Sequence, residues 1–467
     1  MTPGVGLLAR SDNDNDPDMV LTGRASGRAG SGLGGGGGEN DATPSPLSAL
    51  GITGTFTAPP SEAEAAEADE ITRRAERFQL LRIVGSWSTY GRLTGCLKAI
   101  GETFVATKEV ESGKVAGFAG PRTCRLIHLC PWCAAKTRNE RTAVLDRLAK
   151  GWLAAGGSIH FAVFTIADER GELVAETTEA IQRCYSAMWR GAWFERFKHR
   201  YGYIGRIDAF EWTLRLDGSG HPHLQPLIVF NRLLSPVEAD QAISDLRRRW
   251  LHVTDTQGRY ADLHAGFKAD PIALFDGACR AVSAYMTKGS ESWTLGAELC
   301  RGDAKRSRSE TTFAPFDLAR YAMATGDMSA RFAWREFERA SRGVKSLRYT
   351  RGLKGLMEYA ATNGRIVALI VEDDDDGPDI DPTEQEETDE VADKSQKQEC
   401  KLSADTWNWC RDEGLLDGLL RVVETCADGD AVNAVRLFLG HAGADDHIVA
   451  GVKPPFAEPM TTGTGGA

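Results

Sequence analysis

The sequence lacks the features that mark membrane proteins, secreted proteins and common nucleotide-binding classes. Nowhere do eighteen apolar residues run together, and no apolar stretch resembling a signal peptide opens the chain. There is no glycine-rich loop with the spacing that cradles phosphates, and there are no internal repeats. These absences predict a cytoplasmic protein with no membrane partner.

The net charge of −11 conceals an uneven distribution along the 467 residues. Residues 1–70 carry 3 Lys and Arg against 11 Asp and Glu, and residues 371–467 carry 7 against 24. Residues 71–370 carry 45 against 31, so the body of the chain is basic between acidic ends. That asymmetry favours binding of a polyanion by the body alone.

Composition also divides the chain into expected regions. Residues 1–70 are rich in Gly, Ser, Ala and Asp, which cannot build a core, so we expect a disordered leader. The remaining expected regions are two folded regions at 71–155 and 156–300, a basic helical segment at 301–365, an acidic linker at 366–402, a small helical unit at 403–445 and a disordered tail at 446–467.

Clustered cysteines point to a structural metal site in the first of these regions. Cys124, Cys130 and Cys133 lie within ten residues, and the last two form a Cys-Pro-Trp-Cys knuckle before a predicted helix. Zinc prefers four N or S ligands in tetrahedral geometry. Cys96 is the best fourth ligand and His128 is the alternative, while a redox pair or merely buried thiols are the other interpretations.

A second candidate metal site lies on a predicted hairpin. An Asp-Gly-Ser-Gly turn separates a strand at 205–214 from an apolar strand that begins with His221-Pro-His223-Leu-Gln225. Alternate residues of a strand share a face, so His221, His223 and Gln225 are expected to point one way. Glu211 on the partner strand could reach the same divalent ion, or it could be a solvated carboxylate.

A candidate nucleophile follows in a predicted helix over residues 274–289. Tyr285 and Lys288 are three residues apart and would share a helix face. A tyrosine can attack an electrophile when a cation stabilises its phenolate and a metal polarises the target. An isolated pair with this spacing is more often an amphipathic surface pair, so the case depends on the other motifs.

Other elements are expected from periodicity. A strand at 160–167, a helix at 176–198 with Ile181, Tyr185, Met188 and Trp189 as its core stripe, and a helix at 236–251 are predicted. Arginines with interleaved aromatic residues then fill residues 301–354, a pattern that fits contact with a nucleic-acid backbone. The candidate DNA-binding residues are Arg306, Arg308, Arg335, Arg339, Arg348 and Arg351.

Taken in this order, these stretches resemble the replication initiators of actinobacterial rolling-circle plasmids, a family of HUH endonucleases. The resemblance covers about residues 85–360 and includes Val163-Phe-Thr-Ile and Ala284-Tyr285-Met-Thr-Lys288 besides the cysteine and histidine motifs. It implies an α+β protein with an HUH-type antiparallel β-sheet flanked by helices in the 156–300 domain, an N-terminal zinc-binding module and disordered acidic ends.

The resemblance also implies an activity, that of a metal-dependent tyrosine DNA endonuclease (nickase) and strand transferase acting at the plasmid double-strand origin. Tyr285 would form a 5′-phosphotyrosine, Lys288 would neutralise developing charge, and one Mg²⁺ or Mn²⁺ would polarise the phosphate. Origin DNA and a host helicase and polymerase are the expected partners, and a homodimer is an open alternative.

Two positions depart from the family pattern. The second metal histidine is replaced by Gln225, and Ala281 stands where some plasmid initiators carry a glutamate that activates water. A glutamine oxygen is a harder and weaker ligand, so the preference for Mg²⁺ or Mn²⁺ should remain while affinity falls. The alternatives are an HUH-type transposase and a catalytically decayed origin-binding zinc protein.

Overall fold

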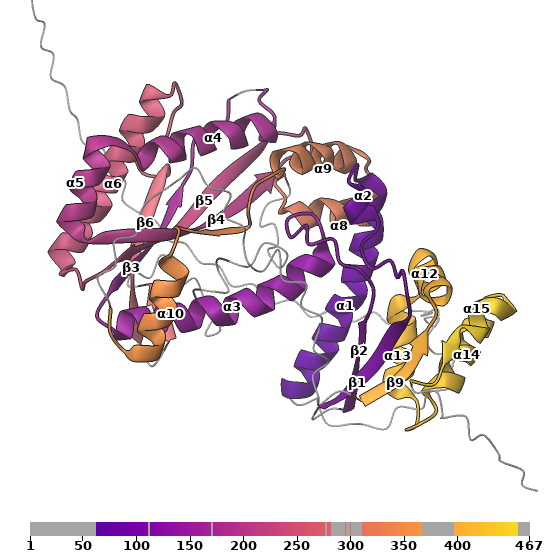
Figure 1. Ribbon diagram of the computed structural model, residues 1–467. Coiled ribbons are helices and arrows are strands. Elements are labelled where there is room, and N and C mark those ends of the chain that lie inside the picture. The colour runs from indigo at the N-terminus through magenta and orange to yellow at the C-terminus, as the bar shows by residue number, and fades with distance from the viewer. Residues whose placement is uncertain are drawn as a thin grey trace, which may run out of the picture. The chain divides into compact units, whose positions relative to one another are not determined.

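The computed structural model describes residues 62–455 except 111–112, 170, 276–277, 282–294, 296–298, 300–310 and 367–396. Helices and antiparallel strands alternate along this part of the chain, which confirms the expected mixed α+β class (Figure 1). In the described part, no helix combines the length and apolar character needed to cross a membrane.

The larger sheet has six strands in the order β7-β6-β3-β5-β4-β8, and every neighbouring pair is antiparallel. Its two longest strands form the predicted hairpin, and Gly218 in their turn has a φ of 81°, which glycine adopts without strain. The strands are β3 (Ser158–Phe164), β4 (Tyr203–Leu214), β5 (Gly220–Phe230), β6 (Phe267–Phe275), β7 (Ala278–Ala281) and β8 (Leu347–Tyr349).

Helices cover both faces of this sheet (Figure 1). Helices α4 (Val174–Met188), α5 (Gly191–Tyr201) and α6 (Pro236–Thr256) bury one face around Phe164 and Phe230. On the other face, α3 (Pro131–Ala154) and α10 (Leu353–Asn363) pack on a second core. Apolar residues therefore fill both sides of β3 and β5, as expected for central strands.

The smaller sheet joins segments from the two ends of the described chain. Its order is β10-β9-β1-β2, so β9 (Lys397–Leu402) pairs with β1 (Thr103–Val110) although almost three hundred residues separate them. The guanidinium of Arg74 on the first helix binds Glu424 at 2.6 Å. The other elements here are α1 (Glu62–Trp87), α2 (Gly91–Thr94), β2 (Gly113–Ala119), α12 (Ala404–Glu413), α13 (Leu416–Thr425), α14 (Ala431–His441), α15 (Asp446–Ala450) and β10 (Val452–Lys453).

The smaller sheet and the helices around it include residues for which the sequence predicted no regular structure. Helix α1 begins inside the expected leader, β9 ends the expected linker, and α15 and β10 lie in the expected tail. Two further helices, α8 (Pro315–Thr325) and α9 (Ser329–Ala340), pack on each other and on α1. One hydrophobic core runs from the smaller sheet past α8 and α9 to Trp212 at the end of β4.

Two helix predictions need correction. The helix expected at 176–198 is split into α4 and α5, because Arg190 is extended and Gly191 has a φ of 80°. Its stripe around Tyr185 is buried core, as predicted. The helix expected at 274–289 is wrong in its first part, where residues 278–281 form β7 and pair with β6.

Candidate metal-binding and catalytic site

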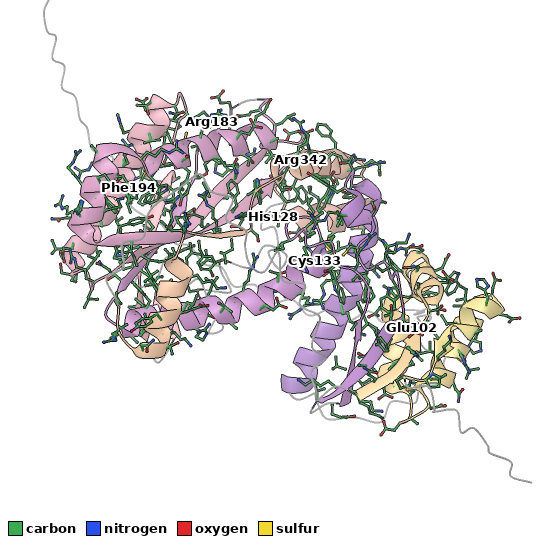
Figure 2. The ribbon with its side chains drawn as sticks, in the orientation of Figure 1. Glu102, His128, Cys133, Arg183, Phe194 and Arg342 are labelled. Atoms are coloured by element: carbon green, nitrogen blue, oxygen red, sulfur yellow. The ribbon has the colours of Figure 1, made fainter. Side chains whose placement is uncertain are left out.

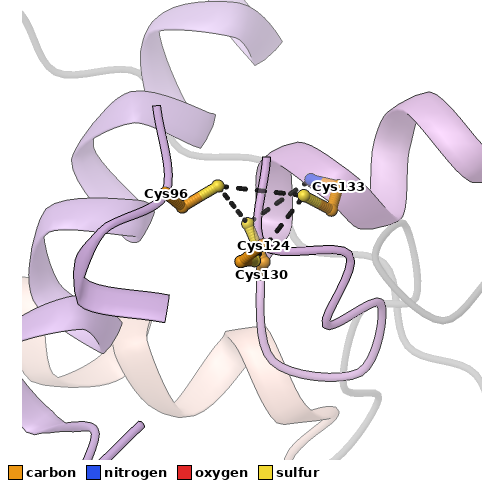
Figure 3. A group of neighbouring side chains, drawn as sticks. All are labelled: Cys96, Cys124, Cys130 and Cys133. Carbon is orange, nitrogen blue, oxygen red and sulfur yellow. Dashed lines mark hydrogen bonds between the residues drawn. The ribbon is translucent and has the colours of Figure 1, made fainter. Parts of the chain in front are cut away.

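The structure brings the four predicted cysteines together (Figure 3). The sulfurs of Cys96, Cys124, Cys130 and Cys133 lie within 4.8 Å of one another, and all four side chains are buried. Measured contacts are 3.5 Å for Cys96–Cys130, 3.6 Å for Cys124–Cys133 and 3.8 Å for Cys96–Cys133. Four bonds of ~2.3 Å at tetrahedral angles place sulfurs ~3.8 Å apart, so the cluster fits zinc.

The backbone around the cluster is shaped for ligation. Leu97 and Arg125, each directly after a cysteine, have φ values of 61° and 56°, the positive region that non-glycine residues rarely adopt. Cys130 caps helix α3, and its sulfur accepts a hydrogen bond from the backbone N–H of Cys133 at 3.4 Å. Two tight turns and a helix N-terminus therefore aim the thiols at one point.

Three of the four packed thiols differ in how readily they ionise, because burial and mutual hydrogen bonds shift their pKa values in opposite directions. Hydrogen bonds from Cys124, Cys130 and Cys96 hold the pKa of Cys133 far below its ordinary value. Burial raises the pKa of Cys130 well above its usual range. A bound metal replaces the shared protons and allows all four sulfurs to ionise.

Helix α12, from the C-terminal part of the chain, holds the loop that carries Cys96, a contact that the sequence did not predict. The Trp407 indole N–H donates to the carbonyl of Leu97 at 2.7 Å, and the Arg411 Nε donates to the carbonyl of Cys96 at 2.9 Å. The amide of Asn408 pairs with both backbone groups of Ala99 at 2.9 Å. Residues over 300 positions away therefore support one corner of the cluster.

His128 is not part of the cysteine cluster, so Cys96 is the fourth member of the set (Figure 2). Burial lowers the pKa of His128 to about 4, and the ring stands edge-on to Trp212 with 4.8 Å between ring centres. Its Nε2 is buried and has no hydrogen-bond partner in the structure as described. The imidazole is thus neutral near pH 7, with one nitrogen unused.

The hairpin β4–β5 sets the register of the second site. Glu211 lies opposite His223, and Ala209 lies opposite Gln225. Directly paired residues project from the same face of a sheet. The amide Nε2 of Gln225 donates to Oε2 of Glu211 at 2.6 Å. The structure therefore gathers an imidazole, a carboxylate and an amide on one face, a donor set that fits Mg²⁺ or Mn²⁺.

His221 shares this face, but its ring is engaged by protein groups. Its Nε2 lies 2.6 Å from the hydroxyl of Thr165, and its Nδ1 lies 3.6 Å from Asp168, which in turn binds Arg215 at 2.5 Å. Burial lowers the pKa of His221. Thr165 and Asp168 were not singled out from the sequence, because no local pattern links them to the hairpin.

The hairpin carries too few ligand side chains to bind a cation without further oxygen donors. Within the described residues, the cysteine cluster is the only group of three or more His, Cys, Asp or Glu side chains close enough to share one ion. A cation on the hairpin would therefore need the amide of Gln225 together with water or substrate oxygens. Such partial protein ligation is typical of Mg²⁺ sites.

Of the other eight predicted site residues, four lie outside the described part of the chain and four lie within it. Tyr285, Lys288, Arg306 and Arg308 lie outside the described residues. Arg348 binds Asp208 at 2.9 Å beside buried Arg206, and Arg339 binds Glu336 at 2.8 Å on α9. The last two of the six arginines, Arg335 on α9 and Arg351 before α10, are half-buried and exposed, respectively.

These features define an α+β protein with antiparallel sheets and a buried four-cysteine cluster that could hold a metal ion such as zinc. Among curated proteins, the chain is similar to one named "Protein rep" from Streptomyces lividans. The two are 24% identical over 318 aligned residues, and the match covers 56% of this chain and 70% of that protein. No protein-family model matches the chain, and no solved structure matches it.

Proposed function

We propose that this chain is a plasmid rolling-circle replication initiator of the HUH type. The observation that carries the proposal is the placement of Glu211, His223 and Gln225 on one face of a single hairpin. The similarity to a protein named rep supports the same conclusion. The basic charge of residues 71–370 is consistent with a DNA substrate.

In the proposed reaction, the phenolic oxygen of Tyr285 attacks the scissile phosphorus of the origin strand. A new phosphorus–oxygen bond forms to Tyr285, whose phenolic proton is lost to solvent. The bond to the 3′ oxygen breaks, and that oxygen takes up a proton from solvent to become a free 3′-OH. Lys288 balances the charge that develops on the phosphate. A Mg²⁺ or Mn²⁺ ion held by Glu211, His223 and Gln225 would supply Lewis-acid polarisation of the phosphate.

The cysteine cluster has a structural role in this proposal. All four protein ligands would be thiolates, which leaves no open position for a substrate or a catalytic water. Zinc would fix the start of α3 beside the hairpin. The protein would act in the cytoplasm, where its 3′-OH product would be extended by a host polymerase with a helicase.

The decisive experiment combines a nicking assay with a single-atom substitution. The protein is incubated with supercoiled plasmid carrying the candidate origin, with Mn²⁺, Mg²⁺ or chelator, and the products are run on a denaturing gel. We expect a metal-dependent nick with the 5′ end attached to protein. Tyr285→Phe should keep DNA binding and lose nicking, whereas Tyr359→Phe on α10, a matched control, should nick normally.

Two outcomes would contradict the proposal. A Tyr285→Phe protein that still forms the covalent adduct would remove Tyr285 from the nucleophile role. Origin binding without nicking under either metal would favour the alternative of an origin-binding zinc protein that has lost its catalytic site.

A further inference from the structure

A pocket opens beside Glu211 and Gln225 of the hairpin. It lies between the loop that joins Cys124 to Cys130 and the β4 edge of the larger sheet. Strand β8 pairs with β4 only as far as Ala209, and the next described pairing on that edge is the bridge between Leu214 and Phe313. Over residues 210–213, β4 pairs with β5 on one side, and the described chain places no strand on its other side. The pocket lies along this stretch of the edge and opens to solvent.

The pocket is continuous with the proposed metal site. Glu211 and Gln225 form part of its wall, so a ligand in the pocket would lie next to these side chains. The opposite wall comes from the loop and helix that the cysteine cluster fixes, through Ile127, His128 and Thr137. Any occupant would therefore contact both metal-binding modules of the protein.

One buried polar atom in this wall needs a partner. The His128 ring stands edge-on to Trp212, while its Nε2 has no hydrogen-bond partner in the described part of the chain. Buried polar atoms without a partner are rare in folded proteins. An N–H or C=O group on a ligand would satisfy Nε2.

The remaining lining combines cationic and aromatic side chains. Arg138 and Arg141 lie on one face of α3, and the Arg141 guanidinium donates to the hydroxyl of Ser346 at 2.6 Å. Phe210 and Trp212 stack on each other with 4.6 Å between ring centres. Arginines bind phosphates and aromatic rings stack on bases, so the lining matches both halves of a nucleotide.

We propose that this pocket binds one unpaired nucleotide of the DNA strand that is cleaved, close to the scissile phosphate. Its base stacks on Phe210, which lies over buried Trp212, with a polar edge on His128 Nε2, and its phosphate faces Arg138 and Arg141. The inference rests on the proposed function, because it assumes that single-stranded DNA reaches Glu211 and Gln225. It adds a position-specific contact made by the wall that the cysteine cluster supports.

The test is an abasic scan of the origin strand. Fluorescence anisotropy measures binding of single-stranded oligonucleotides that span the nick, each with one base removed, in the presence of chelator so that no cleavage occurs. For the wild-type protein, loss of one base near the nick should weaken binding about tenfold. His128→Ala should bind the intact strand about tenfold more weakly and should no longer respond to that abasic position.

A second variant and a control keep the result interpretable. Because His128 lies two residues from Cys130, Arg138→Gln serves as a further variant, and zinc content is measured for each protein. Arg138→Gln should weaken binding of the intact strand severalfold. Arg147→Gln, exposed on the same helix and outside the pocket, should bind like the wild type.

The outcomes separate this inference from the proposed function. Suppose that the wild type nicks the origin, but removing each base weakens binding as much in His128→Ala and Arg138→Gln as in the wild type. The pocket assignment is then wrong and the nickase stands. If the abasic signature appears but no metal supports nicking, the pocket stands and the nickase fails. Failure to bind any single strand would overturn the inference.

Discussion

Arg411→Ala should weaken zinc binding although Arg411 is not a zinc ligand. Its guanidinium donates to the carbonyls of Cys96 and Thr94, and the side chain is only partly exposed. Without these bonds, the loop that carries Cys96 must be ordered by the metal itself. The cost then appears as lower zinc affinity, because metal binding and local folding are coupled.

The magnitude follows from the two lost hydrogen bonds. A hydrogen bond from a charged donor contributes about 1.5–3 kcal/mol when it is well shielded. Partial exposure of Arg411 reduces this, so we expect about 1–3 kcal/mol for the pair. At about 1.4 kcal/mol per tenfold change, the zinc dissociation constant should rise about 5- to 140-fold.

Competition with a chromophoric zinc chelator measures this change. Arg421→Ala is the matched control, because the ion pair that Arg421 makes in the described part of the chain is with Asp417, one turn away on α13, and its side chain is half exposed. Such a pair contributes only a few tenths of a kcal/mol, so zinc affinity should not change. Equal zinc dissociation constants for folded Arg411→Ala and Arg421→Ala proteins would refute the idea that α12 supports the cluster.

Three further predictions follow from the sites described. Cys130→Ser should lose zinc, whereas Cys426→Ser, outside the cluster, should retain one zinc per chain by metal analysis; unchanged stoichiometry in the first would rule out the cluster. Gln225→His should lower the Mn²⁺ concentration needed for nicking about tenfold, since imidazole is the stronger ligand; an unchanged requirement would remove residue 225 from the metal site. Burial lowers the pKa of His160 to about 4. Below pH 6.5 the unfolded chain therefore takes up a proton at His160 that the folded state does not. The free energy of unfolding should fall by about 2 kcal/mol between pH 7 and pH 5. Denaturant titrations of His160→Phe should show a smaller fall in the free energy of unfolding over this pH range than the wild type shows. An equal fall in the two proteins would contradict this account.

Local signals account for the parts of the structure that could be predicted. Alternation of polar and apolar residues after an Asp-Gly-Ser-Gly turn was enough to predict the hairpin and the shared face of His223 and Gln225. The close spacing of three cysteines predicted their cluster. The β6–β7 pairing also has a local signal in Asp276-Gly277, a dipeptide typical of two-residue hairpin loops, although the residue spacing over 274–289 favours a helix.

Contacts between distant segments could not be predicted in the same way. Strand β9 has the sequence Lys-Gln-Glu-Cys-Lys-Leu, in which only two of six residues are apolar, and its partner β1 lies almost three hundred residues earlier. Nothing local indicates such a pairing, because the pattern that buries Cys400 and Leu402 also fits a surface segment. The link between α12 and Cys96 depends on that pairing and was missed with it.

The two histidines of the hairpin have different neighbours, which supports different roles for them. Thr165 and Asp168 lie on either side of the His221 ring, so that ring is best suited to hold the strand end in place. Gln225 is tied to Glu211 through its amide nitrogen, and this contact can persist while the amide oxygen and the carboxylate bind a cation. We therefore infer that Glu211, His223 and Gln225 form the metal set. Replacing a second imidazole by an amide next to a carboxylate makes that set richer in oxygen, which favours hard ions such as Mg²⁺ and Mn²⁺ over zinc.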